Sequence, residues 1–153
     1  LLDDQGYANF LVEIGGEVRV KGDKDGLGWK IAVEKPIKGD RAVEQVLSLK
    51  NVALATSGDY RNYREIDGVA YSHTIDPSTG RPVTHQLASV TVADSECAMA
   101  DGWATALLVL GPDKGYELAV SRKIPAMFIE RSGDTFIVKQ TSRFERLLAG
   151  EVE

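Results

Sequence analysis

The chain has 153 residues, of which 43% are hydrophobic and 27% are charged, and this balance suits one folded domain with an apolar core. Its formal net charge is −5 and no stripe of lysine and arginine is present, which argues against a nucleic-acid-binding surface. No apolar run approaches the roughly 20 residues that a helix needs to cross a membrane. A single cysteine, Cys97, excludes an internal disulfide and a cysteine-rich zinc site.

The first third of the chain is typical of short strands joined by turns. Residues 9–14 are rich in β-forming residues, and Gly15-Gly16 separates them from a second apolar alternation that reaches Val20. Three further strands are predicted, at residues 29–33, 46–49 and 52–55. Residues 41–47 could instead be helical, because short apolar runs do not separate the two states.

The second half of the chain combines strands and helices. Residues 87–93 alternate as a strand does, and Asp94 or Ser95 can then cap a helix that the Gly111-Pro112 pair ends. A second helix is predicted over residues 113–122, followed by strands at 126–130 and 135–139. Strands and helices that are interleaved without a regular βαβ alternation favour an α+β fold.

The stretch from His73 to Pro82 joins a histidine to a loop that several turn-forming residues punctuate. A histidine can accept a proton and return it near neutral pH. Pro77 and Gly80 suit a tight turn that holds such groups still. On the residues alone, His73 could equally be a hydrogen-bonded residue at a strand end, and Asp76 could serve only the turn. His85 has no role that the sequence assigns and is expected at the surface.

Asp101 and Thr105 are four residues apart on the predicted helix, so their side chains can share one face. Together they would present a carboxylate and a hydroxyl oxygen to one ion. Such hard oxygens suit Mg²⁺, which commonly uses one or two protein carboxylates and completes its shell with water and phosphate. By spacing alone a structural role is the commoner one, since a helical threonine often bonds to the carbonyl four residues earlier.

Thr56-Ser57-Gly58-Asp59 is a strand-to-turn element whose backbone and hydroxyl groups can meet a phosphate or a sugar. Tyr60 and Tyr63 follow it and could stack on a ring, although such tyrosines more often pack with the hydroxyl at the surface. The sequence contains neither a Walker-type phosphate loop nor a Rossmann fingerprint.

Three motifs in this order resemble the ApbE family of FAD:protein FMN transferases: residues 56–63, residues 73–82 and residues 100–107. Residues 9–17 fit as well, so the resemblance covers nearly the whole chain. Family members are about twice as long, and residues 1–6 resemble the end of a helix. The resemblance therefore implies that residues 1–153 are a single C-terminal portion of the family's domain, with the N-terminal half absent.

The resemblance implies an α+β fold with a mixed or antiparallel sheet and packed helices, of T-fold-like architecture. His73 would accept the proton of an attacking hydroxyl, and Asp101 and Thr105 would hold Mg²⁺. Gly102 stands where the family usually has a small alanine-like residue. The residues that would approach bound FAD are Ser57, Ile75 and Asp76.

The implied reaction is a metal-assisted displacement at the FMN phosphorus of FAD, in which a threonine or serine hydroxyl of a target protein attacks and AMP leaves. The implied acceptors are flavin-bearing subunits of the sodium-pumping NADH:quinone oxidoreductase or of Rnf complexes. The implied location is the periplasmic side of the bacterial inner membrane, with a lipid anchor. Two alternatives remain open: hydrolysis of FAD to FMN and AMP, and passive flavin binding by a fragment.

Overall fold

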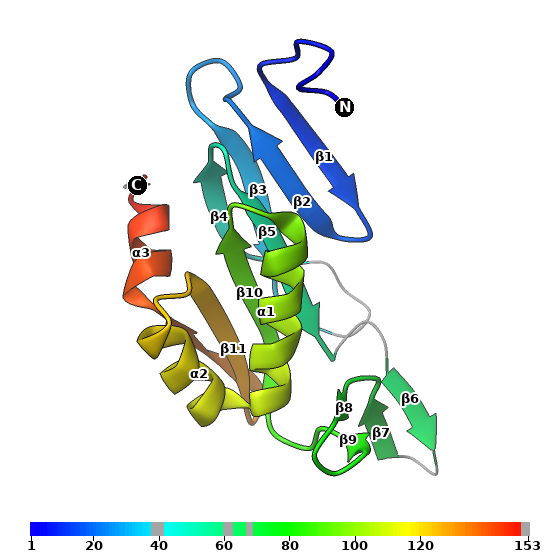
Figure 1. The fold of residues 1–153 in the computed structure, drawn as a ribbon. Helices are drawn as coiled ribbons and strands as arrows, with labels where there is room; N and C mark the ends of the chain where they lie inside the picture. Colours follow the sequence, from blue (N-terminus) through cyan, green and yellow to red (C-terminus); the bar gives the residue numbers. More distant parts are fainter. Residues whose placement is uncertain (38–41, 60–62, 67–68, 151–153) are drawn as a thin grey trace.

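The structure is a computed structural model that describes residues 1–37, 42–59, 63–66 and 69–150. Its centre is a six-stranded sheet in the order β1-β2-β5-β10-β11-β12, in which each neighbouring pair is antiparallel (Figure 1). The strands are β1 (Phe10–Ile14), β2 (Glu17–Lys21), β5 (Ala53–Gly58), β10 (Leu87–Asp94), β11 (Ala126–Ser132) and β12 (Thr135–Gln140).

Within the described residues, the remaining elements are three helices and three hairpins, and the strands of the hairpins pair outside the main sheet. The helices are α1 (Cys97–Leu110), α2 (Pro112–Ser121) and α3 (Ser142–Leu148). The hairpins are β3 (Trp29–Glu34) with β4 (Val43–Leu49), β6 (Tyr63–Ile66) with β7 (Val69–Ser72), and β8 (Ile75–Asp76) with β9 (Arg81–Pro82). In the described part of the chain, no helix is long and apolar enough to cross a membrane.

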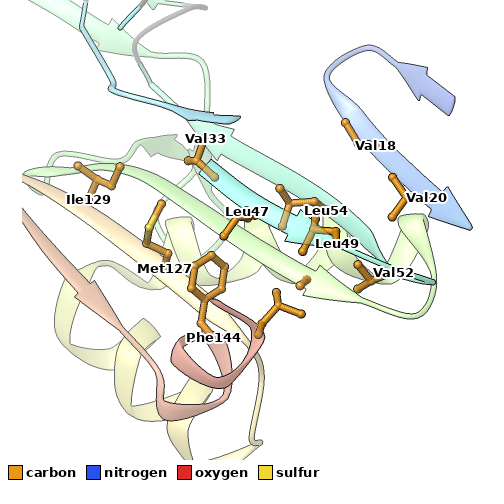
Figure 2. Close-up of a cluster of buried hydrophobic side chains, with 12 residues drawn as sticks. Val18, Val20, Val33, Leu47, Leu49, Val52, Leu54, Met127, Ile129 and Phe144 are labelled. Atoms are coloured by element: carbon orange, nitrogen blue, oxygen red, sulfur yellow. The ribbon is translucent and has the colours of Figure 1, made fainter. Parts of the chain in front are cut away.

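The central strand β10 is covered on both faces, and this explains why seven consecutive residues of it are buried. On one face, Val90 and Val92 pack with Leu107 and Leu108 of α1, and α2 extends the same cluster. The other face carries the β3–β4 hairpin and α3, whose buried side chains form a second cluster (Figure 2). The predicted α+β class is confirmed, with the sheet between two covering layers.

The helical alternative for residues 41–47 is wrong. Residue 41 lies outside the described residues, and residues 43–49 form β4, which pairs with β3 through Ile31 opposite Leu47. Leu47 and Leu49 are buried while Ser48 between them is exposed. With this period of two, the buried leucines of β4 face the main sheet and Ser48 faces solvent. The alternation identifies a strand, which the short apolar run alone could not do.

Helix α1 begins slightly later than the sequence indicated. Its N-cap is Glu96, whose side chain makes no capping bond, so neither Asp94 nor Ser95 is the cap. Asp94 acts just before the helix, where its Oδ1 accepts from the backbone N–H of Glu96 at 3.0 Å. The predicted end is confirmed: Gly111 has a φ of 82° at the C-cap.

Two other regions differ from expectation. Residues 2–6 form turns rather than a helix end, and a single helix-like bond joins Gln5 N–H to the Leu1 carbonyl at 3.0 Å.

Helix α3 was not predicted, because a seven-residue segment is too short to show a helical period. The small hairpins β6–β7 and β8–β9 were also missed.

Phe144 anchors α3 to the sheet, and its replacement by alanine should lower the free energy of unfolding by about 3–5 kcal/mol. The side chain is fully buried in the cluster that Figure 2 shows, so its loss leaves a cavity. Urea denaturation of Phe144→Ala measures this, with the half-exposed Val120→Ala as the control. A loss below about 1 kcal/mol would show that α3 does not contribute to the core as described.

Candidate functional site

A cavity of about 600 Å³ lies among the β1–β2 turn, β3, the C-terminal half of β5 and α1. It exists because β2 pairs with β5 only at Val18 opposite Leu54 and Arg19 opposite Ala53. Beyond these pairs, the described residues provide no strand partner for that edge of β5 as far as Gly58. The gap in the ladder leaves room for a ligand beside the sheet.

His73, Ser57, Asp101 and Thr105 all line this cavity. They come from three different parts of the fold: the loop between β7 and β8, strand β5, and helix α1. Asp101 and Thr105 are exposed on α1, as their spacing on one helix face predicts, and His73 is exposed as well. The fold therefore brings together four of the six residues that the sequence singled out.

Ser57 and Thr105 contact each other directly. Their hydroxyl oxygens, Oγ and Oγ1, are 2.9 Å apart, and either can donate. Ser57 lies opposite Val90 of β10, which packs against α1, so the register turns the serine toward the helix. The hydroxyl expected to meet a cofactor and the hydroxyl expected to meet a metal thus form one hydrogen-bonded pair.

Oxygen donors dominate this wall of the cavity. The carboxylate of Asp101 and the hydroxyls of Thr105 and Ser57 are the kind of ligands that Mg²⁺ prefers. Within the described residues, no group of three histidine, cysteine, aspartate or glutamate side chains is placed to hold a metal. Asp101 and Thr105 would therefore hold Mg²⁺ only together with water, substrate phosphate or a further ligand.

The charges around the cavity fit a site that needs a cation. Four carboxylates line it, and Lys30 is the only lysine or arginine among the described lining residues; the carboxylates are those of Glu13, Glu17, Glu34 and Asp101. Such a wall repels a bare phosphate. A divalent ion would offset that repulsion. No site role was predicted for these charged residues of β1, β2 and β3, although residues 9–17 fit the family pattern.

Cys97 opens α1 close to this wall. Burial, with the negative charges of Glu17 and Asp101 added to it, holds the pKa of the Cys97 thiol above its usual range. The thiol therefore stays protonated at neutral pH. A protonated thiol is a poor nucleophile and a poor metal ligand, so Cys97 is assigned no part in the chemistry of the site.

Ile75 and Asp76 lie on the β8–β9 hairpin and are not among the residues that line the cavity. Ile75 is 49% exposed. Asp76 Oδ1 accepts a hydrogen bond from the backbone N–H of Ser78 at 2.8 Å and another from its hydroxyl at 2.7 Å. In this chain Asp76 performs the turn role that the sequence left open for it.

The Asp76 turn should loosen in acid. The hydroxyl and the backbone N–H of Ser78 hold the pKa of the Asp76 carboxyl below its usual range. A lowered pKa contributes stability above the unfolded pKa, and that contribution is lost as the pH falls through the folded pKa. We expect the NMR shift of the Ser78 amide proton to hold steady from neutral pH and to move only below the usual carboxyl range. A midpoint at or above that range would contradict the bonded turn.

His85 is half-buried rather than at the surface. Both of its ring nitrogens are covered, and the described residues offer them no hydrogen-bond partner. A Cβ on Gly111 would come within 2.9 Å of the imidazole Cδ2, so this glycine makes the space for the ring. The prediction for His85 is therefore corrected. Tyr60 and the side chain of Tyr63 lie outside the described residues.

A protein-family model described as "ApbE family" matches residues 1–128. The chain therefore belongs to the ApbE family, and the resemblance noted in its motifs is confirmed. It is 48% identical over 149 residues to the FAD:protein FMN transferase of Vibrio cholerae, and the alignment covers 97% of this chain and 45% of that protein. It is 39% identical to the FAD:protein FMN transferase of Escherichia coli K12, covering 99% of this chain and 43% of that protein.

Solved structures agree with the sequence comparison. The apo form of the Pseudomonas stutzeri flavinyl transferase ApbE superposes with a TM-score of 0.82 at 42% identity, over 99% of this chain and 46% of that one. The ApbE protein of Thermotoga maritima superposes with a TM-score of 0.81 at 32% identity, over 96% and 47%. The predicted ApbE-like architecture is confirmed. The chain spans less than half the length of the relatives that it matches.

Proposed function

We propose that this chain is the C-terminal part of an FAD:protein FMN transferase and supplies that enzyme's metal ligands and general base. The observation that carries the proposal is that His73, Asp101 and Thr105 line the same cavity. The 48% identity to the V. cholerae enzyme over 97% of this chain supports the choice of reaction. The activity belongs to the whole enzyme, of which these residues form one side of the site.

In the proposed reaction, FAD is the FMN donor and a threonine or serine of a target protein is the acceptor. His73 takes the proton of the acceptor hydroxyl. The oxygen then bonds to the FMN phosphorus, the bond from that phosphorus to the bridging oxygen breaks, and AMP leaves with that bond's electron pair. Asp101 and Thr105 would hold Mg²⁺, which would offset negative charge on the pyrophosphate. Ser57 orients the Thr105 hydroxyl through their hydrogen bond.

Ile75 and Asp76 have a different part in this proposal. They follow His73 within three positions in the sequence. The hydrogen bond from the Ser78 N–H to Asp76 stabilises the turn that joins β8 to β9. The exposed Ile75 side chain would offer apolar contact to the flavin ring once FAD is bound. Neither residue moves a proton in the reaction.

Hydrolysis of FAD to FMN and AMP is the second candidate. It is favoured by the exposure of Asp101, Thr105 and His73, because water can reach the groups that would activate the acceptor hydroxyl. The same base and metal ligands would serve both reactions. Which acceptor is used depends on what occupies the space opposite FAD.

The acceptors and the location are proposed from the family resemblance. We propose flavin-bearing subunits of the sodium-pumping NADH:quinone oxidoreductase or of Rnf complexes as acceptors. The enzyme would work on the periplasmic side of the inner membrane and would be lipid-anchored. The net charge of −5 makes a nucleic-acid partner a poor fit.

A hybrid enzyme tests the proposal: the N-terminal part of the V. cholerae relative is joined to residues 1–153 in place of its own matching segment. The hybrid is incubated with FAD, MgCl₂ and an acceptor peptide that contains threonine. We expect AMP release together with a peptide that carries FMN, both detected by mass spectrometry. AMP without modified peptide would favour hydrolysis, and flavin binding with neither product would favour the passive role.

Residues 1–153 alone should show at most a trace of the hybrid's activity. The cavity is open, so these residues form only one side of the cleft. Positioning of the reactants lowers the activation barrier by several kcal/mol in reactions of this kind, so a chain with one side of the cleft should lose far more than half of the enzyme's rate. Mixing the chain with the separate N-terminal part should restore activity. Flavin transfer by residues 1–153 alone, at a rate near that of the hybrid, would contradict the proposal that the site needs both parts.

A further inference from the structure

Asp59 and Arg131 form a two-pronged ion pair across the main sheet. Arg131 Nη1 and Nη2 donate to Asp59 Oδ2 and Oδ1 at 2.8 and 2.6 Å. Both side chains are largely covered, with exposed fractions of 27% for Arg131 and 21% for Asp59. A forked, partly buried pair of this kind fixes geometry far better than a surface ion pair.

The pair spans strand β10 at the point where that strand begins. Asp59 follows β5 directly, Arg131 belongs to β11, and β10 lies between them in the sheet. The backbone N–H of Asp59 donates to the Ala88 carbonyl at 3.1 Å, and the N–H of Arg131 donates to the Gln86 carbonyl at 2.9 Å. The register of β10 with β11 shifts between Leu87 and Ser89, so the regular ladder is interrupted here.

The chain leaves the sheet after Asp59 and rejoins it at Leu87. The described residues between them, 63–66 and 69–86, carry the β6–β7 hairpin, His73 and the β8–β9 hairpin, and we call this part of the chain the excursion. Figure 1 shows these hairpins set away from the end of the six-stranded sheet. The ion pair and its two backbone bonds therefore sit at the base of the excursion, where its two ends meet.

We propose that the Asp59–Arg131 pair is a positioning device that fixes the base of the His73-bearing excursion, so that His73 faces Ser57, Asp101 and Thr105 across the cavity. The inference rests on the proposed function, because it assigns the pair to the orientation of that site's base. Asp59 and Arg131 touch no reacting atom and are positioning residues. They act by keeping His73 aligned with the groups on β5 and α1, which belong to the main sheet and to the helix layer that covers it.

The pairing at the C-terminal end of β5 shows why a further tie is needed at Asp59. The edge of β5 that faces the cavity has no strand partner among the described residues beyond Leu54. On its other edge, β5 is held by β10 as far as Gly58 opposite Ser89. The bond from the Asp59 N–H to the Ala88 carbonyl extends that hold by one residue, and the ion pair adds a second tie, from Asp59 to β11. Without these two ties, the base of the excursion would lose its links to β10 and β11 at Asp59.

Asp59→Asn and Arg131→Gln in the hybrid enzyme test the pair. Each removes a charge; Asp59→Asn keeps the size of the side chain, and Arg131→Gln also shortens it. We expect kcat to fall about 10- to 100-fold while KM for FAD changes less, because a small misplacement of a base is costly. Arg131→Lys keeps the charge without the fork and should give an intermediate value. Lys50→Gln breaks the exposed pair with Asp23, and neither residue lines the cavity; it is the matched control and should leave kcat unchanged.

A double-mutant cycle with His73→Ala separates positioning from simple structural support. If the pair acts through His73, Asp59→Asn should cost less than about twofold once His73 is gone. The charge-swapped variant, Asp59→Arg with Arg131→Asp, should recover part of the lost kcat. Full kcat in both single variants would overturn the inference, as would an equal loss with and without His73.

Amide exchange on the 153-residue chain gives a readout that does not need activity. In Asp59→Asn, the amides of residues 59 and 131 should exchange at least tenfold faster than in the parent, while those of β12 stay unchanged. If the hybrid transfers no flavin, the proposed function fails, and the exchange still decides whether the pair holds the base. Unchanged exchange at both amides would overturn the inference.

Discussion

Replacement of Asp101 by asparagine should reduce Mg²⁺-dependent flavin transfer by at least about 100-fold. The substitution keeps the size of the side chain and removes the one carboxylate from the donor set of Asp101, Thr105 and Ser57. A bound metal contributes several kcal/mol of charge stabilisation, and each 1.36 kcal/mol is a factor of ten in rate. Thr105→Val should act in the same direction, because it removes a donor and leaves the Ser57 hydroxyl without its partner.

A magnesium titration of AMP release in the hybrid enzyme measures this effect. Asp113→Asn is the matched control, since Asp113 is an exposed helix-start carboxylate outside the cavity lining. We expect the apparent Mg²⁺ requirement to rise in Asp101→Asn and Thr105→Val and to stay constant in Asp113→Asn. A normal Mg²⁺ requirement in Asp101→Asn would remove this residue from the metal site.

Replacement of His73 by alanine should lower kcat about 10²- to 10⁴-fold with little change in FAD affinity. This is the range expected when a general base is lost. The imidazole lies on the cavity wall in a loop rather than in either apolar cluster, so the fold should keep its stability. Turnover, flavin affinity and thermal melting are to be measured on one preparation.

His85→Ala is the informative comparison, because the chain has only two histidines. His85 packs against Gly111 away from the cavity lining, so its loss should lower the melting temperature and leave turnover nearly intact. The two variants should thus show opposite patterns. A folded His73→Ala variant with full activity would refute the general-base assignment.

Local chemistry made part of the site predictable. The spacing of Asp101 and Thr105 sets their shared face once α1 is recognised, and the Asp76 turn needs only its own neighbours. The family motifs added His73 and the order of the parts. The shared helix face and the Asp76 turn could be predicted because each depends on residues within a few positions of each other.

The contacts that build the cavity could not be predicted in this way. Ser57 and Thr105 are 48 positions apart, and they meet only because β5 lies beside β10 under α1. The ion pair of Asp59 with Arg131 joins residues 72 positions apart. Strand order decides both contacts, and no local pattern in the sequence encodes that order. The β4 segment shows the same limit, since only packing on the sheet separates strand from helix there.

The most direct test of this account is the mass of an acceptor peptide after incubation with the hybrid enzyme, FAD and MgCl₂. We predict that the peptide gains one FMN on a threonine or serine hydroxyl, with release of an equal amount of AMP. We also predict that Asp101→Asn and His73→Ala greatly reduce both products. An unmodified peptide from a folded hybrid that binds FAD, in a reaction where the V. cholerae enzyme modifies the same peptide, would contradict the proposal.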